Sequence, residues 1–138
     1  MSVEINNKTK QKIDLALVKK VGEIFLKRYK KTSKAVSVAF VEGERMRQLN
    51  KNYRGIDKTT DVLSFIGEGD DLGEIIIDFS QIKRQAKKYN NSVRQELIFI
   101  LIHGLLHLLG YDDETEIGRA EMEKIGNKFF DTLDSQNI

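Results

Sequence analysis

An apolar run from Leu97 to Leu109, which holds both histidines of the chain, is the feature that most constrains the fold. It closes a helical stretch predicted over 80–109, whose earlier part is basic and polar. From Leu97 on, apolar residues occupy nearly the whole helix circumference, so this half must be buried in a protein core. The run is shorter than the ~20 residues needed to cross a bilayer. We therefore expect a globular domain built around this helix, with no membrane span.

Hydrophobic periodicity predicts the other elements. We expect strands at 3–5, 35–41, 62–66 and 74–79, and helices at 13–25, 46–53, 80–109 and 122–133. The last two strands should form a hairpin, and the three successive Ile of 74–79 indicate a strand covered on both faces. Four strands and about five helices make a single α+β domain over residues 1–138.

Composition narrows the possible functions. The chain has no Cys, which excludes disulfides, thiolate zinc sites and cysteine nucleophiles. Its first residues show no export signal, so we expect a cytoplasmic protein. Residues 1–34 hold ten Lys/Arg against three Asp/Glu, and 112–138 hold three against eight. This asymmetry is compatible with an anionic partner such as nucleic acid, or with a solvated Lys-rich helix face.

His103 and His107 lie four residues apart, so both imidazoles project from one helix face. Burying them among Leu and Ile costs free energy unless each has a polar partner, and a shared metal ion would serve both. Two separately hydrogen-bonded core histidines would also fit. Gly104 stands where zinc proteases of the His-Glu-x-x-His type carry their general base, so a protease of that type is not expected.

Three carboxylates follow the predicted helix stop at Gly110, namely Asp112, Asp113 and Glu114. A loop carboxylate can complete a catalytic zinc site of two His and one acid, with an open position for water. The same acids could instead cap the final helix through its dipole.

Three motifs carry a family resemblance. Residues 103–113, His-Gly-Leu-Leu-His-Leu-Leu-Gly-Tyr-Asp-Asp, resemble the signature His-Gly-x-x-His-Leu-x-Gly-Tyr-Asp-His of the YbeY family of bacterial rRNA-maturation endoribonucleases. Residues 49–65 resemble its block Leu-Asn-x-x-Tyr-Arg-x-x-Asp-x-Pro-Thr-Asp-Val-Leu-Ser-Phe, and 72–75 its following strand. The chain departs from the pattern at Thr59, where the family has Pro, and at Asp113, where it has a third His.

The resemblance implies a mixed four-stranded sheet packed with helices, and a metal site at the end of the long buried helix. It also implies a zinc-dependent, single-strand-specific endoribonuclease that acts in 16S rRNA 3′ end maturation and ribosome quality control. Its partners would be rRNA and the small ribosomal subunit. By position, His103, His107 and Asp113 take the metal-ligand places, and Arg54 that of an arginine important for activity.

Asp113 alters the metal site that the resemblance implies. A carboxylate in place of a neutral imidazole reduces the charge of the site from +2 to +1, which should raise the pKa of bound water. Its shorter side chain leaves Asp112 or Glu114 as alternative ligands. An oxygen ligand also favours other divalent metals such as Mn or Co beside one Zn²⁺ per chain.

Further residues are assigned roles around the metal. Arg54 is expected to clamp the phosphate and stabilise transition-state charge, with a surface ion pair to Asp57 or Asp61 as the alternative. Lys51 and Lys58 are candidate contacts to the RNA backbone.

Two hydrogen-bonding residues complete the candidate site. We expect the Ser64 hydroxyl either to face the metal or to bond only to the backbone. Glu96 lies on the helical stripe of His103 and would orient a metal ligand, with a solvated or capping carboxylate as the alternative.

Two other functions remain open. One is a non-catalytic ribosome or rRNA-binding assembly factor whose metal is structural or absent. The Asp at position 113 is the feature that supports this alternative. The other is a metal-dependent hydrolase of a non-RNA substrate. The sequence leaves the oligomeric state open.

Overall fold

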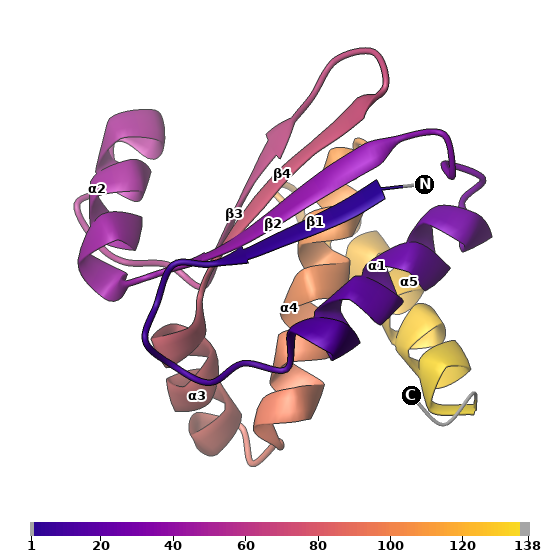
Figure 1. The fold of residues 1–138 in the computed structure, drawn as a ribbon. Helices are drawn as coiled ribbons and strands as arrows, with labels where there is room; N and C mark the ends of the chain where they lie inside the picture. Colours follow the sequence, from indigo (N-terminus) through magenta and orange to yellow (C-terminus); the bar gives the residue numbers. More distant parts are fainter. Residues whose placement is uncertain (1, 136–138) are drawn as a thin grey trace.

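A single mixed sheet organises the computed structural model, which describes residues 2–135 (Figure 1). Its strands are β1 (Ser2–Asn7), β2 (Ala35–Val41), β3 (Val62–Ile66) and β4 (Asp71–Asp78), in the order β1-β2-β4-β3. The β1, β2 and β4 strands pair in parallel, and β3 pairs antiparallel to β4 as its hairpin partner. The predicted four-stranded mixed sheet is thus confirmed, and β3 forms one edge of it.

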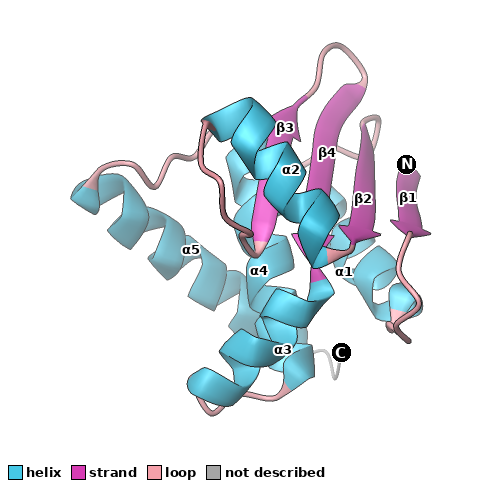
Figure 2. Cartoon of the chain, turned by 90° about the vertical axis from the view of Figure 1, so that its left-hand side faces the viewer, coloured by secondary structure: helices cyan, strands magenta, loops and turns pink. Residues whose placement is uncertain are grey.

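Five helices cover the sheet. They are α1 (Leu15–Arg28), α2 (Gly43–Arg54), α3 (Phe79–Lys88), α4 (Val93–Leu108) and α5 (Glu116–Ser135). The α1 and α4 helices pack on one face, α5 packs on α4, and α2 lies alone across the opposite face (Figures 1 and 2). No helix among residues 2–135 is both long and apolar enough to cross a membrane.

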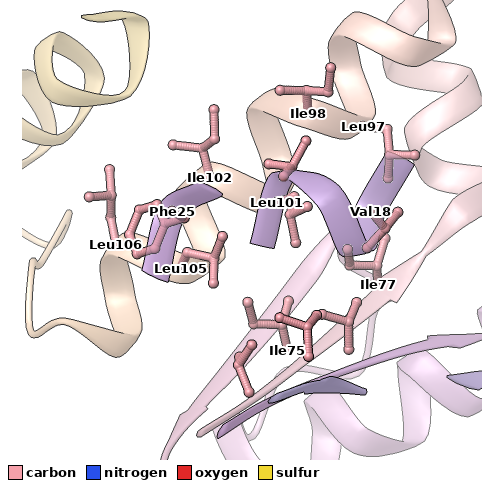
Figure 3. Close-up of a cluster of buried hydrophobic side chains, with 14 of the residues drawn as sticks. Val18, Phe25, Ile75, Ile77, Leu97, Ile98, Leu101, Ile102, Leu105 and Leu106 are labelled. Atoms are coloured by element: carbon pink, nitrogen blue, oxygen red, sulfur yellow. The ribbon is translucent and has the colours of Figure 1, made fainter. Parts of the chain in front are cut away.

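The α4 helix forms the centre of the main core, as its composition predicted. Leu97, Leu101 and Leu105 lie almost fully buried between α1 and the sheet (Figure 3). Ile75 and Ile77 of β4 join this cluster, whereas Ile76 belongs to a smaller cluster under α2. The β4 strand is therefore covered on both faces, which confirms the prediction from its three successive Ile.

The single helix predicted over 80–109 is wrong, because the chain breaks between α3 and α4. Asn90 adopts a positive φ of 57°, and the N–H of Asn91 bonds to the carbonyl of Ala86 as α3 ends. Ser92 then starts α4 with a capping box: its hydroxyl accepts from the N–H of Gln95, and its own N–H donates to the Gln95 side chain. This Ser-x-x-Gln pattern was readable in the sequence.

Candidate metal centre and its cleft

A close approach of α4 to the sheet places the two histidines. A Cβ added to Gly104 would stand 3.1 Å from Ile75 Cγ2 and 3.3 Å from Ser64 Oγ. The Ser64 hydroxyl donates to the Gly104 carbonyl at 3.3 Å. Because Gly104 has no side chain, α4 lies against β3 and β4 with His103 and His107 on either side of this contact. A glutamate here, as in a His-Glu-x-x-His protease, has no room.

Three potential ligand atoms converge at the end of α4. His103 Nε2 lies 3.1 Å from His107 Nε2 and 3.2 Å from Asp113 Oδ2, and His107 Nε2 lies 3.7 Å from Asp113 Oδ1. Ligand atoms at about 2.0–2.1 Å from a tetrahedral Zn²⁺ are separated by roughly 3.3 Å. His103 Nε2 has this spacing to His107 Nε2 and to Asp113 Oδ2, whereas His107 Nε2 is nearest to the other carboxylate oxygen, at 3.7 Å. The three side chains are half-buried, so the site they outline faces the solvent on one side.

The chain turn after α4 brings Asp113 back over the helix end. Gly110 adopts a φ of 99°, and the N–H of Tyr111 bonds to the carbonyl of Leu106. Asp112 accepts the N–H of Glu114 at 2.7 Å, which ties that carboxylate to its own loop. Among the described residues, Asp112 and Glu114 line the cleft but lie outside the group of converging ligand atoms.

Burial favours the neutral form of His103, the form that binds metal. Desolvation lowers the pKa of His103, and His107 lowers it further, while the carboxylates of Asp113 and Asp61 oppose this shift. A neutral imidazole keeps its lone pair available at lower pH, because protons compete less for it.

A cleft of about 650 Å³ opens over these three residues. Its wall includes Arg54, Asp61 and Ser64, in addition to residues of β3 and of the loop after α4. Arg54 ends α2, where Gly55 adopts a φ of 71° and stops the helix. Two of the residues assigned from sequence, Arg54 and Ser64, thus share one cleft with the candidate ligands, whereas Lys51 and Lys58 are exposed outside its lining.

Arg54 makes no ion pair in the described part of the chain, so neither alternative partner engages it. Asp57 pairs instead with Arg47, at 2.7 Å from Nε to Oδ1 and 3.4 Å from Nη2 to Oδ2. Arg47 lowers the pKa of Asp57 through this hydrogen bond. The guanidinium of Arg54 is left available to an anion in the cleft.

The loop between α2 and β3 is held at further points. The Asn50 amide donates to the Lys58 carbonyl at 2.9 Å, and the Thr59 hydroxyl donates to Asp78 Oδ2 at 2.8 Å. Asp78 is fully buried and also caps α3. The hydrogen bond from Thr59 therefore anchors the loop to the buried end of β4.

Glu96 contacts neither histidine directly. Its carboxylate, only 7 % exposed, accepts from the Gln85 amide at 3.1 Å and from the Asn91 amide at 3.2 Å. The same Gln85 nitrogen lies 3.3 Å from Asp61 Oδ2. Glu96 is therefore linked through Gln85 to Asp61, which lines the cleft beside His103.

Sequence reasoning considered Asp61 only as a partner for Arg54. Its place at the entry to β3, inside the motif of residues 49–65, was the signal that could have marked it as part of the site.

The comparisons with known proteins agree with this geometry. The family model described as "Endoribonuclease YbeY" matches residues 4–134. Proteins of that description from Acholeplasma laidlawii and Geobacillus thermodenitrificans are 45% identical over 105 residues and 46% identical over 112 residues. These matches cover 71% and 68% of this chain and 77% and 72% of the relatives.

Two further comparisons extend over most of the chain. A protein of the same description from Wolinella succinogenes is 34% identical over 125 residues, which cover 88% of this chain and 85% of the relative. A protein from Thermotoga maritima with a known solution structure is 29% identical and superimposes with a TM-score of 0.65. That superposition covers 97% of this chain and 93% of the other.

Proposed function

Because the chain belongs to the YbeY family of endoribonucleases, we propose that it hydrolyses single-stranded RNA with the help of a divalent metal ion. The observation that carries this proposal is the convergence of His103, His107 and Asp113 in a cleft that also holds an unpaired arginine, Arg54, among the described residues. A cation site beside a free guanidinium suits a phosphodiester, which carries a negative charge at the reacting centre.

We propose one Zn²⁺ per chain, held by His103, His107 and Asp113. When bound, the ion supplies a Lewis acid that stabilises negative charge on a phosphoryl oxygen and lowers the pKa of water. The Asp113 carboxylate makes the ligand set harder than three imidazoles, so Mn²⁺ or Co²⁺ is also accommodated.

Arg54 is the proposed catalytic residue of the chain. Its guanidinium donates hydrogen bonds to the non-bridging oxygens of the scissile phosphate and offsets the charge that develops on them. Ser64 contributes by positioning, because its hydroxyl joins β3 to the backbone of α4 between the two histidines. Lys51 and Lys58, outside the cleft, attract the phosphates on either side of the cleaved bond.

Asp61 and Glu96 position the site in this proposal. Asp61 faces His103 closely enough to raise its pKa, and its carboxylate is itself held by Gln85. Glu96 fixes the Gln85 amide in turn, so its effect on the metal ligands is indirect.

The biological role follows from the family. We propose that the RNA is 16S rRNA near its 3′ end and that the partner is the small ribosomal subunit. In this proposal the protein acts in ribosome quality control in the cytoplasm. Residues 1–138 form its single catalytic domain. A non-catalytic rRNA-binding factor is the second candidate. The feature that favours it is the carboxylate at position 113, which weakens the Lewis acidity of the metal.

Cleavage of a fluorescent single-stranded oligoribonucleotide from the 16S 3′ region tests the proposal. Zinc-loaded protein should cut it, should spare the same strand in a duplex, and should lose activity with a chelator and regain it with zinc. His107→Ala should be inactive. RNA that is bound but never cut, with unchanged binding in His107→Ala, would replace the nuclease with the binding factor. Cleavage of a small phosphodiester or ester without RNA cleavage would indicate the non-RNA hydrolase.

A further inference from the structure

Two aromatic side chains form a ledge beside the metal cleft. Tyr53 is 67% exposed, and Phe65 lies half-buried against the small core cluster under α2. The rings of Tyr53 and Phe65 meet edge to face, with centroids 5.0 Å apart. Exposed aromatic rings held in this way are costly to leave in water. We call Tyr53 and Phe65 the aromatic ledge.

The aromatic ledge lies next to the metal cleft. Ile66 lines both this cleft and a larger groove of about 1070 Å³ on the sheet face beside α2. Tyr53 and Phe65 line the groove only, and Tyr53 is the neighbour of Arg54, which lines the cleft. A polymer whose phosphate occupies the cleft therefore meets the ledge at the boundary between the two hollows.

Charge indicates which part of such a polymer the ledge receives. The groove beyond the ledge is lined by four acidic residues, Glu4, Glu42, Asp71 and Glu74, against two basic ones, Lys8 and Arg45. An RNA backbone running along this floor would be repelled. An uncharged, flat base that turns into the mouth of the groove meets only the apolar ledge, while its phosphates stay on the side of Arg54 and Lys51.

We propose that Tyr53, supported by Phe65, stacks a nucleobase of the RNA strand next to the cleaved phosphodiester. The inference rests on the proposed function and deepens it, because a base can reach the ledge only from an unpaired strand. Stacking on an aromatic ring tolerates any base, so the ledge selects for single-stranded RNA rather than for a sequence. Duplex RNA keeps its bases in the helix and cannot use it.

Steady-state cleavage of a short single-stranded oligoribonucleotide by the zinc-loaded protein is the first test. Tyr53→Ala should raise KM between about fivefold and about 150-fold, the range of one lost stacking contact, with little change in kcat. Tyr53→Phe keeps the ring and should behave as the wild type. Tyr89→Ala is the matched control, since Tyr89 is 59% exposed at the end of α3, away from both hollows.

Two further measurements separate stacking from charge. The slope of log Kd against log salt, measured by anisotropy with an all-deoxy strand, should be unchanged in Tyr53→Ala and flatter in Arg54→Ala, because Arg54, unlike Tyr53, contacts phosphate. Abasic nucleotides placed one position at a time should reveal one position where Tyr53→Ala has no further effect. Such non-additivity identifies the stacked base.

The inference is overturned if KM and Kd of Tyr53→Ala stay within twofold of the wild type, if Tyr53→Phe is as defective as Tyr53→Ala, or if no abasic position couples to Tyr53. A defect found with ribosomal subunits but not with naked RNA would assign the ledge to a protein partner instead. Should the wild type cut no RNA, the proposed nuclease fails, and the anisotropy measurements still decide whether the ledge binds a base.

Discussion

Asp113 Oδ2 lies 3.2 Å from His103 Nε2 across the turn that ends α4. This contact places a carboxylate beside the two imidazoles at the end of α4. The neighbouring carboxylates, Asp112 and Glu114, do not join the group among residues 2–135. The contact therefore leads to a ligand assignment that can be tested residue by residue.

Metal content should follow this assignment. His103→Ala, His107→Ala and Asp113→Ala should each lose most of the zinc that copurifies with the wild type, because two ligands rarely retain it. Asp112→Ala is the matched control and should keep about one zinc per chain. Mass spectrometry of the native protein measures this. If zinc were retained in Asp113→Ala and lost in Asp112→Ala, Asp112 rather than Asp113 would be the third metal ligand.

Gly104→Ala should destabilise the protein and loosen the metal site together. The new Cβ would crowd Ile75 and the Ser64 hydroxyl, so α4 must shift from the sheet, at a cost of about 1–3 kcal/mol. Urea unfolding and zinc affinity report the two effects. Gly126→Ala on α5 is the control, since its nearest contact would be an ordinary 3.7 Å. Wild-type stability and zinc affinity in Gly104→Ala would show that the contact between α4 and the sheet accommodates a methyl group.

Arg54→Ala should separate catalysis from metal binding. Losing a donor to the transition-state charge should lower kcat by roughly 10²- to 10³-fold. Zinc content should be unchanged, because Arg54 contacts no candidate ligand. Arg54→Lys keeps the charge but not the planar fork, and should recover only part of the rate. Equal losses of zinc and activity in Arg54→Ala would contradict a phosphate-binding role.

The acid sensitivity of the metal-free protein should reflect His103. Its pKa in the folded chain lies below the ordinary 6.5, mainly through burial, so the unfolded chain binds the proton first. The free energy of unfolding should therefore fall as the pH drops through about 6.5 and level off below the folded pKa. Asp113→Asn removes a charge that raises this pKa and should lower it further. NMR titration of the His103 ring measures both, and a wild-type midpoint above 6.5 would disprove the prediction.

Asp78→Ala should destabilise the fold and release the α2–β3 loop. Asp78 caps α3 and accepts the Thr59 hydroxyl, and both hydrogen bonds would be lost, at about 1–3 kcal/mol. Thr59→Val removes only the second and should cost less. Thermal unfolding gives the stability, with Asp70→Ala in the exposed β3–β4 turn as control. Equal effects of Asp78→Ala and Asp70→Ala would mean that the buried carboxylate contributes nothing.

Local patterns in the sequence predicted most of the fold. The all-round apolar surface of α4 and the three Ile of β4 reflect burial directly, so both were placed correctly. The break at Asn90 was missed because hydrophobic periodicity continues across it, and only the cap formed by Ser92 and Gln95 marks the new helix.

In the candidate site, too, the features that depend on one helix were predictable from the sequence, and the contacts between separate elements were not. His103 and His107 share a helix face, so their approach follows from spacing alone. The hydrogen bond from Ser64 to Gly104 and the pairing of Arg47 with Asp57 depend on how separate elements pack. Neither contact is encoded in a local pattern. The link from Glu96 to Asp61 through Gln85 likewise needs the positions of two helices and a loop.

The candidate metal ligands all come from residues 103–113, whereas Tyr53, Arg54 and Asp61 come from the segment before β3. The two sets are separate in the sequence and meet only in space, where Asp61 acts on His103 through its charge. The exchange of His for Asp at position 113 requires a single nucleotide change in the codon. A change at position 113 would therefore alter the candidate ligand set in one mutational step and leave Tyr53, Arg54 and Asp61 as they are.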